Sequence, residues 1–175
     1  MTRPLRLAAL AALAGLAVAA PLAAQTPADS AATTAAAAED TLSAAETSAQ
    51  FLARVAARPG VERSRSGVLW TVARRGSGQR PMRSESVLAT YVGRLADGTV
   101  FDASPDGAPV RLPVRAVVAG FAEALQAMRP GETRTVWLPP DLAYGRAGVR
   151  GRGGAWRIPP DAALVFEITL VRVVP

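Results

Sequence analysis

Alternation of apolar and polar side chains is the clearest pattern in this 175-residue chain. Over residues 86–95 it gives a single apolar face, made of Val87, Ala89, Tyr91 and Leu95. A strand that is buried on one side has this period of two. A turn-forming tripeptide, Ala96-Asp97-Gly98, follows the strand. The returning strand then completes a predicted hairpin over residues 91–104.

The chain after residue 66 contains further strand patterns and one helix pattern. Strands are predicted over residues 67–74, 132–138 and 163–174, and residues 110–112 form a short apolar piece. The strand over residues 163–174 has one apolar face, made of Leu164, Phe166, Ile168 and Leu170. A helix is predicted over residues 117–128, with a shared face of Phe121, Ala124, Leu125 and Met128. Many strands with one short helix predict an α+β fold, in which an antiparallel β-sheet wraps around the helix.

The first 24 residues have the pattern of a secretory signal peptide. Arg3 and Arg6 precede an apolar run over residues 7–20, and small residues lead up to Gln25. The run is too short to span a membrane comfortably, and we expect no stable membrane insertion after cleavage. Cleavage predicts an exported protein, most simply a periplasmic one, with an outer-membrane-associated or secreted protein as the alternatives. An uncleaved N-terminal anchor is the alternative.

A linker and a helix are predicted between the signal peptide and the folded body. Residues 25–42 are rich in Ala, Thr and Ser, which predicts a disordered tether. Ser43 and Glu46 have the spacing of a capping box, so we expect a helix over residues 43–58. Its apolar seam contains Leu42, Ala45, Ala49, Leu52 and Ala56. This weak seam is compatible with packing on the chain's own domain or with a weak homodimer through residues 43–58.

Composition excludes several kinds of chemistry. The chain has no Cys and no His, so it lacks disulfides, thiolate zinc sites, cysteine nucleophiles and histidine bases. Its net charge of +6 comes from arginines spread along the body of the chain. Nucleic-acid-binding proteins usually cluster such charge with aromatic residues. A basic solvated surface is therefore favoured, and no nucleic-acid partner is expected.

Several large apolar residues fall at the ends of the predicted elements or in loops. They are Tyr91, Phe101, Val117, Val118, Phe121, Tyr144, Ile158 and Phe166. Core packing explains any one of them. As a set, together with the carboxylate of Asp102, they predict a small apolar pocket with a few polar groups that orient a ligand.

Five segments, in order and at compatible spacing, resemble those of the FKBP-type peptidyl-prolyl cis/trans isomerases, which bind macrolide drugs. Residues 91–104 are similar to the family signature Y-x-G-x-L-x-D-G-x-x-F-D-x-S. The other segments are residues 117–128, 140–145, 158–160 and 164–166. The resemblance covers residues 66–175. Residues 51–54, 60–61 and 66–69 also resemble the exported, macrophage-infectivity-potentiator-like branch, whose N-terminal helices dimerise.

The resemblance implies catalysis of cis/trans isomerisation at X-Pro bonds in unfolded or folding exported polypeptides, with macrolides as inhibitors. The uncatalysed rotation crosses a barrier of about 20 kcal/mol and takes tens of seconds or more. It makes and breaks no covalent bond, so no metal or cofactor is expected. A chaperone or binding module without enzymatic activity is the alternative function on the same fold.

The resemblance also assigns roles to particular residues. The proline pocket is expected to be lined by Phe101, Val110, Val117, Val118, Phe121, Ile158 and Phe166. Tyr144 is expected to donate its hydroxyl to a substrate carbonyl, and the Val118 N–H to hold another. Asp102 and Tyr91 form the polar side in this assignment. An ordinary exposed carboxylate and a purely structural tyrosine are the alternatives for these two.

Three positions and one loop depart from the family pattern. Phe121 stands where Trp is more frequent, Val110 where an aromatic is usual, and Arg157 where a second aliphatic residue is usual. Residues 145–157 form a longer loop than is common, with four Arg, five Gly and Trp156. Its glycines predict mobility. A substrate flap that favours acidic clients and a merely solvated loop are both compatible with this composition.

Overall fold

The structure of the chain is a computed structural model that describes residues 46–174. The expected signal peptide (residues 1–24), the expected linker (residues 25–42) and Ser43 lie outside the described residues. In the described part, no helix is long and apolar enough to cross a membrane.

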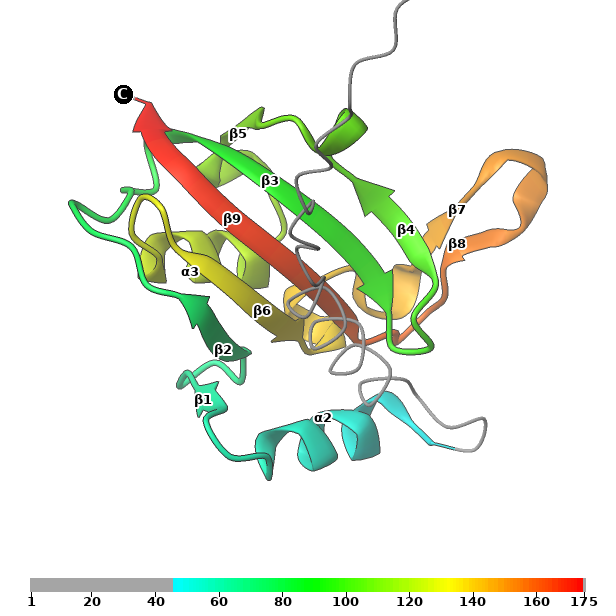
Figure 1. Ribbon diagram of the computed structural model, residues 1–175. Coiled ribbons are helices and arrows are strands. Elements are labelled where there is room, and N and C mark those ends of the chain that lie inside the picture. Colours follow the sequence, from blue (N-terminus) through cyan, green and yellow to red (C-terminus); the bar gives the residue numbers. More distant parts are fainter. Residues whose placement is uncertain (1–45, 175) are drawn as a thin grey trace, which may run out of the picture.

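A seven-stranded sheet forms the body of the protein (Figure 1). Its strands are β1 (Glu62–Arg63), β2 (Leu69–Arg74), β3 (Ser86–Leu95), β4 (Val100–Ala103), β5 (Val110–Pro113), β6 (Thr133–Leu138) and β9 (Leu164–Val174). The order is β1-β2-β6-β9-β3-β4, and β5 also pairs with β3. Every pairing is antiparallel. A separate two-stranded hairpin contains β7 (Val149–Arg150) and β8 (Trp156–Ile158).

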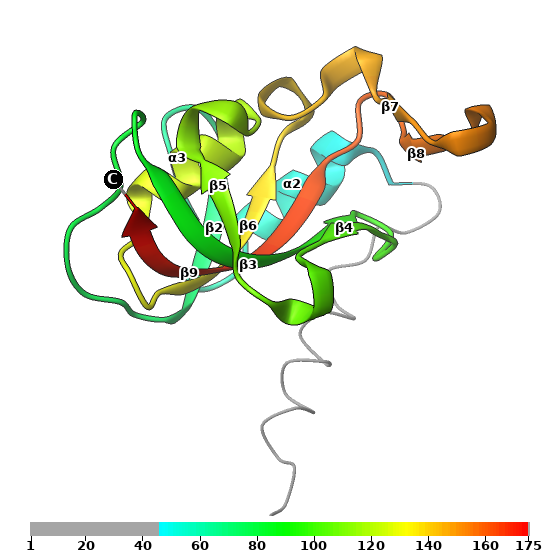
Figure 2. The same cartoon turned by 90° about the horizontal axis from the view of Figure 1, so that it is seen from above.

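Within residues 46–174 the α-helices are α2 (Ser48–Ala56) and α3 (Ala119–Ala127). Five short 3-10 segments lie in the connections: η1 (Pro105–Gly107), η2 (Val114–Ala116), η3 (Pro140–Leu142), η4 (Gly145–Ala147) and η5 (Arg152–Gly154). Figure 2 shows α3 against one side of the sheet, with the β7–β8 hairpin extending away from it. The predicted α+β fold, an antiparallel sheet with a short helix packed on it, is confirmed.

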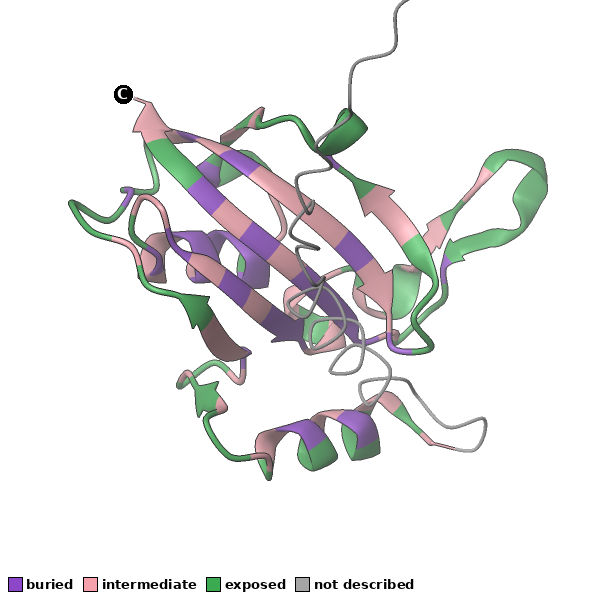
Figure 3. Ribbon diagram, viewed as in Figure 1, coloured by how far each residue is buried: buried purple, intermediate pink, exposed green. Residues whose placement is uncertain are grey.

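The main core lies between α3 and the sheet, as the alternation in the sequence predicts. Buried residues alternate with less buried ones in β3, at the start of β6 and in the middle of β9, whereas residues 136–138 and 164–166 are buried on both faces of the sheet (Figure 3). The predicted inward face of β9, from Leu164 to Leu170, is buried, and so is the predicted face of α3. Burial of these apolar side chains supplies the main stabilising free energy of the domain.

The long pairing between β3 and β9 sets the geometry of the site. It runs from Ser86 opposite Val174 to Leu95 opposite Leu164, with one register shift between Leu88 and Ala89. Because side chains alternate between the two faces of a strand, this register brings the rings of Tyr91 and Phe166 to the α3 side of the sheet.

The other face of the sheet is partly covered by α2. Phe51 and Val55, both 0% exposed, pack with residues of β2, β6 and β9, which are Leu69, Trp137 and Val165. The Ser48 hydroxyl accepts a hydrogen bond from the Ala163 N–H at 3.0 Å and donates to the Asp161 carbonyl at 2.8 Å. These contacts attach the start of α2 to the segment that leads into β9.

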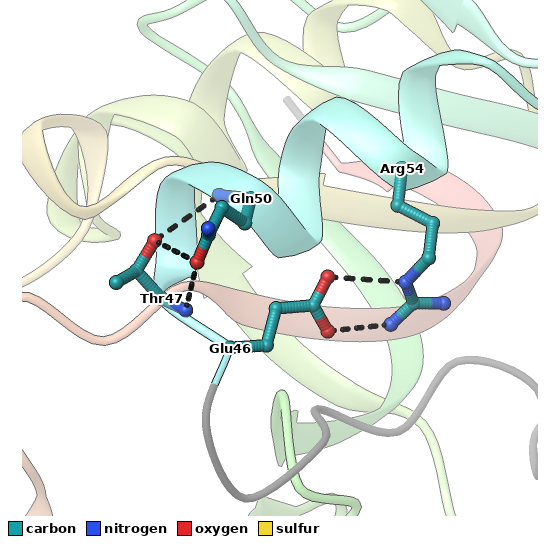
Figure 4. Close-up of polar contacts among 4 residues, drawn as sticks. All are labelled: Glu46, Thr47, Gln50 and Arg54. Carbon is teal, nitrogen blue, oxygen red and sulfur yellow. Dashed lines mark hydrogen bonds and ion pairs between the residues drawn. The ribbon is translucent and has the colours of Figure 1, made fainter.

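The prediction that Ser43 and Glu46 cap this helix over residues 43–58 is wrong in its start. Thr47 is the N-cap, and it forms a reciprocal capping box with Gln50 (Figure 4). Glu46 instead accepts two hydrogen bonds from Arg54, at 3.0 and 3.1 Å. Thr47 is followed three residues later by Gln50, so it satisfies the same sequence rule as Ser43 and Glu46.

The predicted apolar seam of this helix also differs from the buried face. Ala49 is exposed, and Leu52 and Ala56 are half-buried, whereas Phe51 and Val55 are fully buried. Leu42 and Ala45 lie outside the described residues. The larger side chains therefore direct the helix onto its own sheet, because they bury more apolar area than the alanines.

Two predictions from the sequence, the loop over residues 145–157 and the start of the folded domain at residue 66, differ from the structure. Residues 145–157, predicted as a glycine-rich loop, contain η4, β7, η5 and the first two residues of β8, which ends at Ile158. Residue 66, where the folded body was expected to begin, lies in the connection between β1 and β2, two strands that pair in the same sheet. The sheet therefore includes residues that precede this boundary.

Replacement of the buried ring in α2 tests whether this helix is part of the cooperative fold. We expect Phe51→Ala to lower the free energy of unfolding by about 3–5 kcal/mol, because it leaves a cavity in the core. The measurement is urea denaturation followed by tryptophan fluorescence. Val171→Ala, at a position 41% exposed, serves as the control, with a change of about 0.5 kcal/mol or less. An equally small loss in Phe51→Ala contradicts the prediction.

Candidate active site

An apolar cavity of about 280 Å³ opens where the β3–β4 hairpin meets the start of α3. It is lined by Tyr91, Phe101, Asp102, Leu112, Ala116, Val117, Val118, Phe121, Tyr144 and Phe166. The lining therefore contains all the predicted site residues except Val110 and Ile158. Segments far apart in the sequence supply its walls, as a site between a sheet and a helix requires.

Aromatic rings in edge-to-face contact form the floor of the cavity. The Phe121 and Phe166 rings are 4.9 Å apart between centroids, and the Phe101 and Phe166 rings are 5.6 Å apart. The Tyr91 and Phe121 rings are 5.9 Å apart between centroids, with an interplanar angle of 78°. Edge-to-face contacts of this kind stabilise a fixed arrangement of rings. The floor is therefore preformed.

Gly93 makes this ring packing sterically possible. Gly93 lies on β3 opposite Phe166, and a Cβ atom placed on it would come within 2.8 Å of both the Phe101 and the Phe166 rings. Real Cβ atoms essentially never approach that closely. Glycine is needed at position 93 because the two rings pack against its backbone, and not because of a positive φ angle.

The polar side of the cavity is a hydrogen bond across the β3–β4 hairpin. Gly93 pairs with Asp102 in the hairpin register, which places the Tyr91 hydroxyl 2.8 Å from Asp102 Oδ2, to which it donates. Burial, and then the hydrogen bond and charge of Asp102, raise the pKa of Tyr91 to about 12. Tyr91 therefore stays a neutral donor throughout the physiological pH range.

Arg157 makes a contact with this polar side that the sequence did not predict. Its Nε and Nη2 atoms donate to the Phe101 carbonyl at 2.8 and 2.6 Å. Its Nη2 atom also lies 3.2 Å from Asp102 Oδ1, as an ion pair. One carboxylate is thus held by a phenol from β3 and by a guanidinium from β8. The sequence had indicated Arg157 only as a departure from the family pattern, at a position where an aliphatic residue is usual.

Two donors at the edge of the cavity are available to a ligand. Tyr144 lies between η3 and η4, is 39% exposed, and its hydroxyl forms no hydrogen bond to another described residue. Val118 is the N-cap of α3, and within residues 46–174 its N–H has no acceptor. Such groups are satisfied by water or by a bound ligand.

Two predicted lining residues lie elsewhere. Val110 is half-buried on β5 opposite Ala89, and Ile158 is 3% exposed in the main core at the end of β8. The cavity wall instead includes Leu112 and Ala116, which the sequence analysis missed. Leu112 has the same orientation on β5 as Val110, so the alternation of that strand could have identified it.

A larger hollow of about 510 Å³ lies against the opposite face of the sheet. Threonines of β3, β6 and β9 and the carboxylate of Glu167 contribute to its lining. It lacks the set of aromatic rings that surrounds the smaller cavity. Apolar walls with a few converging polar groups are typical of ligand sites, so the smaller cavity is the stronger candidate.

The geometry fits one kind of chemistry better than others. The lining contains no Ser, Thr, Lys, Cys or His, so it lacks the usual nucleophiles and a histidine base. It offers instead an apolar, aromatic floor with hydroxyl and amide donors at the edge. Such a site can hold an apolar group and withdraw an adjacent amide from water.

The chain matches known proteins over the residues that build this cavity. Residues 78–171 match the family model described as FKBP-type peptidyl-prolyl cis-trans isomerase. The chain is 39% identical over 130 residues to the peptidyl-prolyl cis-trans isomerase Mip of Coxiella burnetii, which covers 74% of this chain and 54% of that protein. It is also 39% identical to the outer membrane protein MIP of Legionella longbeachae, over 70% of this chain and 51% of that protein.

The chain thus spans about half the length of the curated relatives it matches. Among solved structures, a peptidyl-prolyl cis-trans isomerase from Pseudomonas syringae pv. tomato is similar with a TM-score of 0.66 and 35% identity. The match covers 82% of this chain and 96% of that one. The fold, the motifs and these matches agree, and the chain belongs to the FKBP-type peptidyl-prolyl cis-trans isomerase family.

Proposed function

We propose that this protein catalyses cis/trans isomerisation of X-Pro bonds in unfolded or folding exported polypeptides. The observation that carries the proposal is the ring-floored cavity with the Tyr144 hydroxyl and the Val118 N–H at its edge. The proline ring occupies the cavity, and the two donors hold carbonyls of the substrate backbone.

The physical basis of catalysis is removal of amide conjugation. The planar amide places negative charge on its oxygen, which water stabilises, whereas the twisted amide is less polar. Transfer to an apolar site therefore disfavours the planar ground state relative to the twisted state. The uncatalysed barrier of about 20 kcal/mol is lowered without a covalent intermediate. This chemistry suits a chain without His or Cys.

The polar side orients the wall of the cavity in this mechanism. Asp102 accepts from Tyr91 and is paired with Arg157, so its carboxylate is fixed on two sides. Tyr91 is in turn held with its ring against Phe121. The carboxylate thus keeps a floor ring in place and faces the imide as one half of an ion pair.

A chaperone without isomerase activity is the second candidate function. It is favoured by the ring of Trp156, which is 42% exposed on the β7–β8 hairpin, and by Val100, which is 50% exposed on β4. Both are apolar groups outside the cavity that unfolded chains could contact. This candidate requires suppression of client aggregation that persists in Tyr144→Phe.

We further propose that the protein is exported to the periplasm. The support is the signal-peptide pattern of residues 1–24 and the resemblance to the outer membrane protein MIP of Legionella longbeachae.

Two further partners are proposed from the family resemblance. Macrolides should bind in the cavity, with reduced affinity because the charged Arg157 side chain makes the edge of the cavity less apolar. A homodimer through residues 43–58 has less support, because α2 buries Phe51 and Val55 in its own domain.

Replacement of Tyr144 tests the isomerase proposal. We expect Tyr144→Phe to lower kcat/KM for a Leu-Pro peptide by about fivefold, since one hydrogen bond to the substrate carbonyl is lost. The measurement is a protease-coupled isomerase assay. Thermal unfolding is the control, because the Tyr144 hydroxyl bonds to no other described residue and its loss leaves the melting temperature unchanged. No turnover by the parent protein above the uncatalysed rate contradicts the proposed function.

The pKa of Tyr91 predicts the pH dependence. The folded pKa of about 12 exceeds the ordinary value of about 10, so protonated Tyr91 contributes stability that is complete below pH 10 and is lost between about pH 10 and 12. Absorbance at 295 nm measures the ionisation of the tyrosine. Asp102→Asn should lower the pKa of Tyr91, and an unchanged titration contradicts the assigned cause.

Activity should not depend on pH near neutrality. We expect kcat/KM to be flat between about pH 6 and 8, where no histidine titrates.

A further inference from the structure

The segment of residues 145–157 carries a concentrated positive charge beside the cavity. It contains Arg146, Arg150, Arg152 and Arg157, all exposed, and no Asp or Glu. Arg157 is paired with Asp102. The other three form no ion pair with any described residue. The Asp161 backbone N–H donates to the Gly145 carbonyl, and the Asp161 carboxylate forms no ion pair with the segment.

The base of this segment is fixed against the cavity wall. Arg157 donates to the Phe101 carbonyl and pairs with Asp102, both of which line the cavity. Gly148, at φ +55°, lies so close to the Ile158 carbonyl that a Cβ atom would be 2.6 Å from it. Figure 1 shows the β7–β8 hairpin beside β4 and projecting beyond it. The charged surface is therefore continuous with the cavity mouth.

The tip of the hairpin combines this charge with an exposed aromatic ring. The Arg150 guanidinium lies over the Trp156 ring at 3.8 Å from its centroid and donates to the Gly154 carbonyl at 2.7 Å. This stacking fixes the guanidinium at the surface and leaves one ring face covered by a cation. Trp156 itself remains 42% exposed.

Positive charge also flanks the other side of the cavity. Arg115 is exposed and adjoins the lining residue Ala116, whereas Arg111 precedes Leu112 on β5 and so projects from the opposite face of that strand. Of the carboxylates near the lining, Glu123 accepts a hydrogen bond from the Ser66 hydroxyl, and Glu167 lines the hollow on the opposite face of the sheet. Asp102 is paired with Arg157, and Asp141 is exposed on η3 close to Tyr144. Around the mouth, Arg115, Arg146, Arg150 and Arg152 therefore outnumber the one carboxylate, Asp141, that forms no ion pair with a described residue.

We propose that residues 145–157 form a docking surface for acidic segments of the polypeptide whose proline occupies the cavity. This inference rests on the proposed isomerase function and specifies its substrates. Charge complementarity carries it, because three arginines without acidic partners lie on a surface that is anchored to the cavity wall. A single-stranded nucleic acid is a poorer fit, since such ligands need several aromatic rings for stacking and this segment offers one.

The test compares three peptides that share a Leu-Pro core and are flanked on both sides by three Glu, three Gln or three Lys. We expect kcat/KM for the Glu peptide to exceed that for the Gln peptide by about threefold at low salt, as a few surface ion pairs allow. The Lys peptide should be the poorest substrate. The ratio of kcat/KM for the Glu peptide to that for the Gln peptide should approach one at 1 M salt, where the Debye length is about 3 Å.

The variant Arg146→Gln/Arg152→Gln should remove most of this advantage. Neither side chain forms a hydrogen bond within the described part of the chain, so the substitutions remove charge without disturbing the hairpin. Arg172→Gln, at an exposed position near the far end of β9, is the matched control and should retain the full ratio. The same peptides are compared in equilibrium binding by fluorescence anisotropy.

The outcomes separate the two proposals. Equal kcat/KM and equal binding for the Glu and Gln peptides overturn the docking surface and leave the isomerase function standing. A ratio that persists in the double variant also overturns it. A single-stranded oligonucleotide that binds more tightly than the Glu peptide assigns the surface to another ligand and overturns it too. If no peptide is turned over, the isomerase proposal fails, and the binding comparison alone decides the docking surface.

Discussion

Packing of the Phe166 ring is the contact on which both the domain core and the cavity depend. Phe166 lies in β9, between β6 and β3, and its ring meets those of Phe101 and Phe121 edge to face. The same ring belongs to the main core and lines the cavity. It fits only because Gly93 has no side chain. The floor of the site is thus a face of the hydrophobic core, which makes it rigid, since interiors are close-packed.

The fold was largely predictable because one face of the sheet is buried by α3. That burial forces a period of two in β3 and β9, and the period is visible in the sequence. The start of α2 was not predictable from capping residues, because Ser43 with Glu46 and Thr47 with Gln50 obey the same rule. Burial of Phe51 and Val55 decides which pattern the helix uses. In residues 145–157, glycine signals both mobility and tight turns, and positive φ at Gly148, Gly153 and Gly154 belongs to the turns.

The candidate site was predictable where it depends on local geometry. Tyr91 and Asp102 lie on paired strands of one hairpin, so their proximity follows from its turn. Arg157 reaches the same carboxylate from 55 residues away. No local pattern contains that contact, because it depends on how the β7–β8 hairpin is placed against β4. Ile158 was wrongly predicted to line the cavity, because its side chain is buried in the main core.

The contact between Arg157 and Asp102 changes how the work of catalysis is divided. An isolated carboxylate near the imide would act through its charge. A carboxylate paired with a guanidinium, with both side chains about half exposed, has a weak net field because the two charges oppose one another and solvent screens them. In the proposed mechanism, the remaining contributions are the apolar floor, which would disfavour the planar amide, and the donors of Tyr144 and Val118, which would hold the substrate backbone. In residues 145–157, the charge that has no ion-pair partner among the described residues lies on Arg146, Arg150 and Arg152. If these arginines dock the substrate as proposed, their charge would act on substrate binding, and rotation of the X-Pro bond would depend on the cavity.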